Sequence, residues 1–223
     1  MIRFVSFEGG DGSGKSTQLE LLAGYLSRQG ISCLSTREPG GTNLGKMLRK
    51  VLLELRDEPI SPETELFLYL ADRAQHVREV IEPAMANGKL VLCDRFTDST
   101  MAYQGYGRGA DLDVLSRMNA IASRGVVPDL TFLLDCPVEV GLSRTQTRLS
   151  SHASRAAAKV KAEDRFEREG ALFHEQVRRG FLELAQADLA RIVVIDAARS
   201  IASIQQEIVM IVEQKLATQH SAK

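Results

Sequence analysis

The feature that most constrains the fold of this chain is a glycine-rich loop placed between an apolar run and a helical pattern. Residues 2–7 are mostly apolar, and residues 9–17 read Gly-Gly-Asp-Gly-Ser-Gly-Lys-Ser-Thr. Leucines recur at helical spacing over residues 15–29, and Gly30 follows as a stop signal. A strand, a loop and a helix in this order predict the phosphate-binding unit of an α/β nucleotide-binding fold.

The spacing within this loop gives each fixed residue a task. Gly9 and Gly14 allow successive backbone N–H groups to turn toward an anion, and the following helix adds its free N–H groups and the positive end of its dipole. Lys15 can reach the outer phosphates, and the Ser16 hydroxyl can ligate Mg²⁺. The alternative is a glycine-rich turn with a surface lysine, but the flanking strand and helix favour a phosphate site.

The composition is that of one ordinary α/β domain. The 223 residues include 44% apolar and 26% charged side chains, and the net charge is −1. We therefore expect a single domain over residues 1–223, with no membrane span and no general attraction to nucleic acid. Cys33, Cys93 and Cys136 are far apart and odd in number, so we expect three buried free thiols. Together with an N-terminus that leaves no room for a signal peptide, they indicate a cytoplasmic protein.

Apolar runs and helical patterns alternate along the whole chain. The runs typical of strands are residues 2–7, 31–36, 89–93, 130–135 and 191–195. The helical patterns are residues 15–29, 43–56, 62–86, 111–124, 137–149, 164–187 and 201–216. This alternation predicts a five-stranded parallel sheet flanked by helices on both faces. Pro83 lies inside the third helical pattern, where we expect a break or a kink.

Polar residues follow two of the predicted strands. Asp94 and Arg95 end the third strand, and Arg37 opens the turn Arg-Glu-Pro-Gly-Gly-Thr after the second. Ligands of open α/β sheets bind outside the carboxyl ends of the strands, so both groups are expected beside the loop at 9–17. There, Asp94 can hold Mg²⁺ or its water, and the arginines can neutralise phosphate. Taken alone, the Asp–Arg pair could equally be a structural strand end, and the second segment only a turn.

Two further segments carry candidate binding residues. Tyr69 and Arg73 share one helical face and could stack on a base and bond its edge, although spacing alone favours a core aromatic beside a surface cation. Residues 99–109 hold too many glycines for a core helix, and their polar and aromatic side chains are typical of a binding loop.

Taken together, these segments resemble the thymidylate kinase family over nearly the whole chain. The resemblance rests on residues 7–17, 36–42, 94–96, 99–109 and 164–167. It implies the fold of a P-loop nucleoside monophosphate kinase with a mobile lid at about 148–164. It also implies transfer of a phosphoryl group from MgATP to the 5′-phosphate of dTMP, giving dTDP and ADP in dTTP synthesis. A homodimer is implied by the resemblance alone.

Positions that match the family's motifs carry over as expected site residues. The resemblance places the ATP site at Gly9, Gly10, Asp11, Gly12, Ser13, Gly14, Lys15, Ser16, Thr17 and Arg144. It places the dTMP site at Asp11, Arg37, Arg49, Tyr69, Arg73, Arg95, Ser99, Thr100, Tyr103 and Gln104. The expected Mg²⁺ ligands are Ser16 and Asp94.

The resemblance also implies what each wall of the dTMP site contacts. Tyr69 looks like the aromatic that stacks on thymine, with Phe67 as a nearby competitor, and Arg73 looks like the residue that bonds O4. Thr100 is at the position that meets the N3 side of the base. Tyr103 is similar to the tyrosine beside the 2′ carbon of the sugar, where it disfavours a ribose hydroxyl.

The phosphate end of dTMP is expected among cations. Arg49 and Arg95 look like the clamp on the acceptor phosphate, with Arg37 in support. Asp11 looks like the acid near the sugar 3′-hydroxyl and the Mg²⁺ site.

One catalytic cation is expected from outside the loop. The expected catalytic residues are Lys15, Arg95, Asp11 and Arg148. Residues 10–14 contain no arginine, so the family pattern assigns the last cation to the lid, where Arg148 acts with Arg144 or Arg155. The cation-rich residues 150–163 are either a solvated face or part of this lid, which would exclude water during phosphoryl transfer.

Other functions remain as alternatives. A kinase for another nucleoside monophosphate would share most of these features. A GTPase-like switch would need N-K-x-D and D-x-x-G motifs, and the sequence has neither, since Asp196-Ala197-Ala198-Arg199 does not match. A non-catalytic P-loop binding protein is the third alternative; the intact Lys15, Ser16, Asp94 and Arg95 argue against it.

Overall fold

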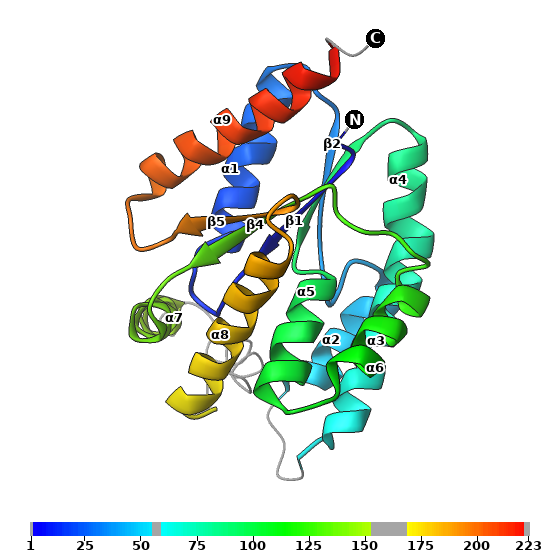
Figure 1. Ribbon diagram of the computed structural model, residues 1–223, viewed down its shortest axis with the longest axis vertical. Helices are drawn as coiled ribbons and strands as arrows, with labels where there is room; N and C mark the ends of the chain where they lie inside the picture. Colours follow the sequence, from blue (N-terminus) through cyan, green and yellow to red (C-terminus); the bar gives the residue numbers. More distant parts are fainter. Residues whose placement is uncertain (1, 55–58, 153–168, 221–223) are drawn as a thin grey trace.

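The computed structural model describes residues 2–54, 59–152 and 169–220. Within these ranges, five strands form one sheet in the order β2-β3-β1-β4-β5 (Figure 1). The strands are β1 (Phe4–Glu8), β2 (Cys33–Arg37), β3 (Leu90–Asp94), β4 (Leu130–Asp135) and β5 (Ile192–Asp196). Every pairing is parallel, so all five carboxyl ends lie at one edge of the sheet. The five expected strands are confirmed, each within a few residues of its predicted bounds.

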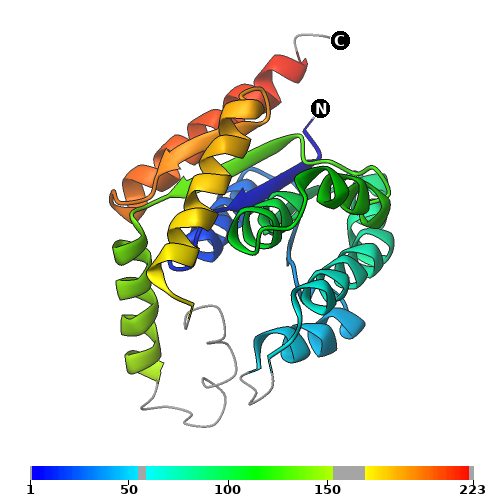
Figure 2. The same ribbon diagram turned by 60° about the horizontal axis from the view of Figure 1, so that its bottom comes forward.

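Helices cover both faces of this sheet, as the alternating pattern predicts. One face carries α1 (Lys15–Arg28) and α9 (Ile201–His220). The other carries η1 (Val77–Ile81), α4 (Glu82–Ala86), α5 (Thr97–Thr100), η2 (Met101–Gly107) and α8 (Ala171–Ala187). A further group packs together and consists of α2 (Asn43–Leu53), α3 (Pro62–His76) and α6 (Leu112–Ala122). Figure 2 shows α7 (Val138–His152) on one side of the strand ends and α2 and α3 on the other.

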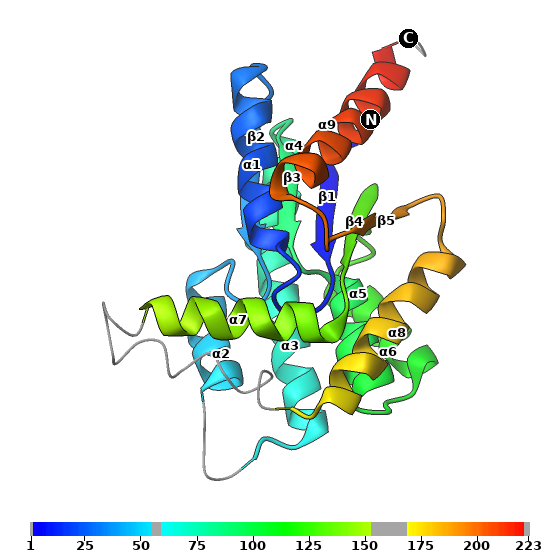
Figure 3. The same ribbon diagram turned by 90° about the vertical axis from the view of Figure 1, so that its left-hand side faces the viewer.

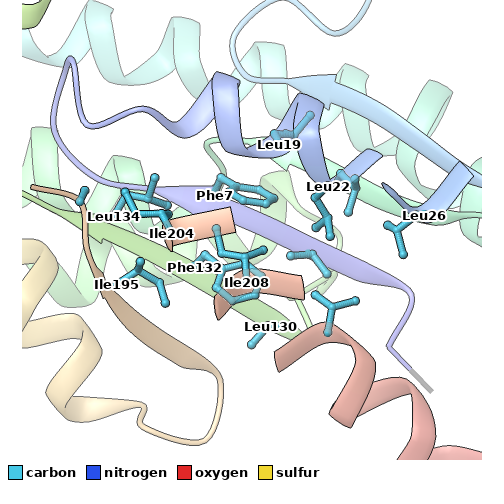
Figure 4. Packing of buried hydrophobic residues seen from close by; sticks show 14 of the residues in the cluster. Phe7, Leu19, Leu22, Leu26, Leu130, Phe132, Leu134, Ile195, Ile204 and Ile208 are labelled. Atoms are coloured by element: carbon cyan, nitrogen blue, oxygen red, sulfur yellow. The ribbon is translucent and has the colours of Figure 1, made fainter. Parts of the chain in front are cut away.

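The core has an apolar layer on each face of the sheet, because successive strand residues point to opposite faces. Phe7 and Phe132 face α1 and α9, which lie side by side over the sheet (Figure 3). Figure 4 shows these two rings among leucines and isoleucines of α1, β4 and α9. Phe4 and Val91 point the other way, toward η1 and α4. Full burial of each such side chain contributes about 1.5–3 kcal/mol.

Two predictions about the region after β4 can be compared with the structure. The helical pattern at 164–187 starts too early, because Gly170 is extended (φ −66°, ψ 158°) and α8 begins at Ala171. Most of the expected lid, about residues 148–164, lies outside the described residues; α7 includes its first part, up to His152.

The interruption expected at Pro83 falls just before the proline. The α-helical pattern of α3 ends at His76, and a π-helical turn, Val77–Ile81, leads into α4. Pro83 occupies the first turn of α4, where a missing backbone N–H costs least. The predicted break is therefore a change in helix type.

The expectation that residues 99–109 form a loop rather than a core helix is wrong. α5 and η2 make residues 97–107 helical, and much of η2 is buried. Glycine here permits close packing: a Cβ on Gly107 would lie 2.7 Å from Cε2 of Phe173 and 3.0 Å from Cγ2 of Val177. Both partners belong to α8, far along the chain, so local composition could not reveal the reason for the glycine.

Two further expectations concern the cysteines and the possibility of a membrane-spanning helix. All three cysteines are free thiols; Cys93 and Cys136 are buried as predicted, whereas Cys33 is only half-buried. Across the described ranges, no helix combines the length and the apolar character needed to cross a membrane.

We predict opposite stability effects for two helical glycines. Gly107→Ala should lower the free energy of unfolding by about 1–3 kcal/mol, because the new methyl overlaps buried side chains of α8. Gly24→Ala is the control; its nearest neighbour would be the Arg28 side chain at 3.6 Å, and the better helix former should add about 0.5–1 kcal/mol. Urea unfolding of both variants measures the difference, and equal midpoints would contradict the packing role of Gly107.

Candidate active site

The sheet brings the two motif-bearing strand ends together. β1 and β3 are neighbours in register, with Phe7 opposite Asp94, so the loop after β1 lies beside Asp94 and Arg95. These ends open into a cavity of about 500 Å³. Its lining includes Asp11 to Thr17 and the other expected contact residues Arg37, Arg49, Tyr69, Arg73, Asp94, Arg95, Ser99, Thr100, Tyr103, Gln104 and Arg144. The cavity thus brings together nearly all the residues expected from the sequence. Gly9 and Gly10 instead line a smaller pocket that shares Asp11 with it.

The P-loop, residues 9–17, is tight because its glycines take conformations that other residues avoid. Gly9, Gly12 and Gly14 all have positive φ. Gly12 also lies against α7: a Cβ on it would be 2.1 Å from the carbonyl oxygen of Gly141. Glycines on both sides therefore let the P-loop and α7 touch through backbone atoms.

Lys15 points back over the loop. It is 7% exposed, and its Nζ donates to the carbonyl oxygens of Gly9 (3.0 Å) and Gly10 (2.8 Å). Burial, reinforced by the positive charge of Arg95, lowers the pKa of Lys15 to about 8. The loop thus holds its cation at the place where the motif predicts phosphates.

Two oxygen groups meet at the start of α1. The Ser16 hydroxyl donates to Oδ2 of Asp94 at 2.5 Å. A hydroxyl and a carboxylate are hard oxygen donors that suit Mg²⁺. Among the described residues, no cluster of three or more His, Cys, Asp or Glu side chains could hold a metal. The donor set fits an ion that takes most of its ligands from phosphate and water.

Arg95 joins the P-loop to the opposite wall. Nη1 donates to the Gly9 carbonyl and the Ser99 hydroxyl, both at 3.1 Å. Nη2 donates to Oδ1 of Asp11 (2.6 Å) and to the Tyr103 hydroxyl (3.0 Å). Burial disfavours the charge of both groups, but their neighbours together outweigh this effect. Tyr103, Asp11 and other acids hold the pKa of Arg95 above its usual value, and Arg95 with Lys15 holds the pKa of Asp11 below its usual value. The guanidinium is held charged between the two walls.

Arg73 is a buried anchor of the second wall, which contradicts the interpretation of a surface cation. It is 2% exposed, and Nε donates to Oε2 of Glu38 at 2.8 Å. Nη1 donates to the Thr100 hydroxyl (2.9 Å) and to Asn119 (2.5 Å), and Nη2 donates to the Phe96 carbonyl (3.0 Å). These bonds fix the plane of the guanidinium against the cavity.

The two aromatic candidates for stacking on a base lie in different surroundings. Tyr69 lines the cavity one helical turn from Arg73, whereas Phe67 is 58% exposed and is not part of the lining. Gln104 also lines the cavity, and its Nε2 donates to the buried Glu65 carboxylate at 2.9 Å.

A buried acid cluster that the sequence reasoning missed supports the turn after β2. Glu38 accepts from Arg73 and also meets Nδ1 of His76 at 2.9 Å. Asp72 accepts from the Gly40 N–H at 3.0 Å, and burial together with the charge of Glu38 raises the pKa of Asp72 to about 6. Arg49 of α2 contacts the same turn and donates to the Pro39 carbonyl at 3.1 Å.

The far end of the cavity is formed by residues after β5. Arg144 of α7 donates to the Ala197 carbonyl at 2.9 Å. Arg199, Ile201 and Ile204 line the same end and were not expected. The strand-end rule could have indicated them, since they directly follow β5.

Of the three arginines expected to act with the lid, Arg144 lies at this end of the cavity. The side chain of Arg148 and the whole of Arg155 lie outside the described residues.

Comparison with known proteins agrees with this arrangement. The family model described as "Thymidylate kinase" matches residues 7–208. The chain is 46% identical to the thymidylate kinase of Geotalea uraniireducens, over 96% of this chain and 98% of that one. It is 53% identical to that of Solidesulfovibrio magneticus, over 88% and 92%.

A solved structure agrees at the level of the fold. The thymidylate kinase from Ehrlichia chaffeensis superposes with a TM-score of 0.72 at 32% identity, covering 94% of this chain and 97% of that one. From the glycine loop, the parallel sheet and these relatives together, it follows that the chain belongs to the thymidylate kinase family and phosphorylates dTMP with ATP.

Proposed function

We propose that the cavity binds both substrates at once, with the ATP phosphates on the P-loop and the 5′-phosphate of dTMP on the facing cations. The observation that supports this most directly is the position of Arg95. Its guanidinium bonds Gly9 and Asp11 of the P-loop and also Ser99 and Tyr103 of the other wall. A cation at that junction lies where a transferring group must pass.

On the donor side, the P-loop (residues 9–17) surrounds the ATP phosphates with backbone N–H groups. Lys15 exchanges its bonds with the Gly9 and Gly10 carbonyls for bonds to phosphate, which are stronger because both partners are charged. Arg144 lies toward the nucleoside of ATP, where α7 meets the segment after β5.

Ser16 and Asp94 are the proposed protein ligands of Mg²⁺. Two ligands suit an ion that keeps near-octahedral geometry and prefers phosphate and water for the rest. The ion would neutralise charge on the donor phosphates. The Ser16 hydroxyl and an Asp94 carboxylate oxygen lie 2.5 Å apart, so one ion can contact both.

On the acceptor side, Tyr69 stacks on thymine, and Arg73 and Thr100 face its edge. Arg73 is fixed by four protein partners, so it presents a rigid cation at little entropic cost on binding. Tyr103 borders the sugar, and Gln104 completes the wall beside it.

The acceptor phosphate lies near Arg37, Arg49 and Arg95. It is already an anion, so it can attack the γ-phosphorus in line without a strong general base. Alignment and cations lower the barrier, with Lys15 and Arg95 as catalytic residues. Asp11 orients Arg95 and faces the sugar 3′-hydroxyl, and Arg148 of the lid supplies the last cation.

The chain acts as a single domain over residues 1–223 in the cytoplasm, a location that its three free thiols support.

A homodimer is the proposed assembly. α2, α3 and α6 pack together, and each carries large exposed apolar side chains, namely Leu44, Met47, Phe67, Val114 and Ile121. Single exposed apolar residues are common, but several on one group of helices indicate a contact surface.

The role of Lys15 on the ATP side of the cavity can be tested by substitution. Lys15→Ala should reduce kcat roughly 10²–10³-fold, because a buried cation on the transferring group is lost. Lys46→Ala, an exposed lysine on α2, is the control. ADP release with dTMP as acceptor measures both, with circular dichroism to check the fold; unchanged turnover in the Lys15 variant would remove this residue from catalysis.

The second prediction concerns sugar selectivity. Tyr103→Ala should bring kcat/KM for dTMP and for its ribose analogue closer together, since the ring no longer blocks a 2′-hydroxyl. Tyr106→Ala is matched to it: Tyr106 is on the same helix but packs on Gly180 outside the cavity. If both variants keep the wild-type ratio, Tyr103 does not border the sugar.

The third prediction tests the assembly. Phe67→Glu should convert a dimer to a monomer by placing charge in the apolar surface, as measured by light scattering after size exclusion. Leu189→Glu, at an exposed position after α8, should leave the mass unchanged. An unaltered mass for the Phe67 variant would place the contact elsewhere.

A further inference from the structure

Glu8, the last residue of β1, is a buried acid to which the proposed function gives no task. It is 0% exposed, and each of its carboxyl oxygens has one partner. Oε1 accepts from the backbone N–H of Phe96 at 2.6 Å. Oε2 meets the Ser99 hydroxyl, also at 2.6 Å. Burying an acid is costly unless its hydrogen bonds are satisfied, and these two bonds both go to the segment that follows β3.

That segment contains a strained residue. Arg95 has φ 71°, a left-handed conformation that only glycine adopts freely. The N–H groups on both sides of its Cα are bonded to β1: the Arg95 N–H to the Phe7 carbonyl at 2.9 Å, and the Phe96 N–H to Glu8. The strained turn is therefore clamped to the end of β1, and Glu8 is one of the two clamps.

The second oxygen of Glu8 connects to the Arg95 side chain through Ser99. The Ser99 Oγ lies 2.6 Å from Oε2 of Glu8 and 3.1 Å from Nη1 of Arg95. An arginine N–H can only donate, so Ser99 accepts from Arg95. Glu8 in turn fixes the position of the Ser99 oxygen, so one side chain controls both the backbone and the guanidinium of Arg95.

We propose that Glu8 is a positioning residue for phosphoryl transfer, which holds the Arg95 guanidinium between the P-loop and the acceptor wall through its bonds to Phe96 and Ser99. The proposal rests on the proposed role of Arg95. Glu8 itself is not part of the cavity lining.

The positioning does not depend on the charge of Glu8. Burial and the nearby Asp98 raise the pKa of Glu8 to about 8, while the bond from Ser99 and the charge of Arg95 oppose the rise. The carboxyl of Glu8 in turn raises the pKa values of Lys15, Cys93 and Arg95 relative to burial alone. Oε1 accepts from Phe96 in either protonation state, and Oε2 either accepts from Ser99 or donates to it. A glutamine can make the same pair of contacts.

This equivalence gives a conservative rescue. Glu8→Ala should lower kcat up to roughly 10²-fold, the scale of loss for a catalytic group misplaced by about 1 Å. Glu8→Gln should regain most of that loss, because its amide oxygen accepts from Phe96 and its amide nitrogen donates to Ser99. Glu8→Asp, which keeps the carboxyl group but is one methylene shorter, should behave like the alanine variant.

The matched control is Asp135, the last residue of the neighbouring strand β4. It also accepts two hydrogen bonds, from Nε and Nη2 of Arg178 at 2.7 and 2.9 Å, but it does not line the cavity. Asp135→Ala should lower the melting temperature without lowering kcat.

A double-mutant cycle with Arg95→Ala distinguishes an effect of Glu8 that acts through Arg95 from a loss of activity caused by a general disturbance of the structure. If Glu8 acts through Arg95, Glu8→Ala and Glu8→Asp should each cost less than about 2-fold in kcat once Arg95 is absent, since nothing is left to position. An equal loss in both backgrounds, or wild-type kcat in Glu8→Asp, would overturn the proposal. Wild-type turnover in Arg95→Ala alone would instead refute the proposed role of Arg95, so the two failures are distinguishable.

Discussion

The parallel pairing of β1 with β3 is the constraint on which the rest of the site depends. With Phe7 opposite Asp94, the chain leaves both strands at the same edge, and the P-loop and Arg95 emerge side by side. β2 and β4 flank this central pair, so the turn with Arg37 and the start of α7 fall at the same edge. A sheet in which β1 and β3 were not neighbours would separate the P-loop from Arg95.

The cations of the site are held by internal partners. Lys15 bonds loop carbonyls, Arg95 bonds Asp11, and Arg73 bonds Glu38. Buried cations without such partners would lose protons or expel the side chain toward water. Because the partners fix each donor in place, the phosphates meet groups that are already oriented, and little reorganisation is needed during transfer. A bound phosphate must compete with the Asp11 carboxylate for Arg95. This competition favours ligands that carry more negative charge than a carboxylate.

Sequence reasoning predicted the elements whose signals are local. The P-loop spacing and the strand-end positions of Arg37, Asp94 and Arg95 needed only neighbours in the chain. It failed where the deciding partner is distant: Gly107 is glycine because of α8, and Arg73 is buried because Glu38 and Asn119 surround it. Its assignment of residues 99–109 to a loop treated the glycines as incompatible with a core helix, when dense helix packing produces the same composition.

An acid stands at or just after the carboxyl end of every strand, at the edge where anions bind. These acids are Glu8, Glu38, Asp94, Asp135 and Asp196. Placed at random, they would repel phosphate, but each is engaged by a nearby donor within the described structure. Their partners are a backbone N–H and Ser99, Arg73, Ser16, Arg178 and the Ala198 N–H, respectively. Three of these acids, Glu8, Glu38 and Asp94, hold Ser99, Arg73 and Ser16 at the cavity, whereas Asp135 and Asp196 are not part of its lining. On this view, the positive character of the site depends on where its carboxylates are held as much as on its lysine and arginines.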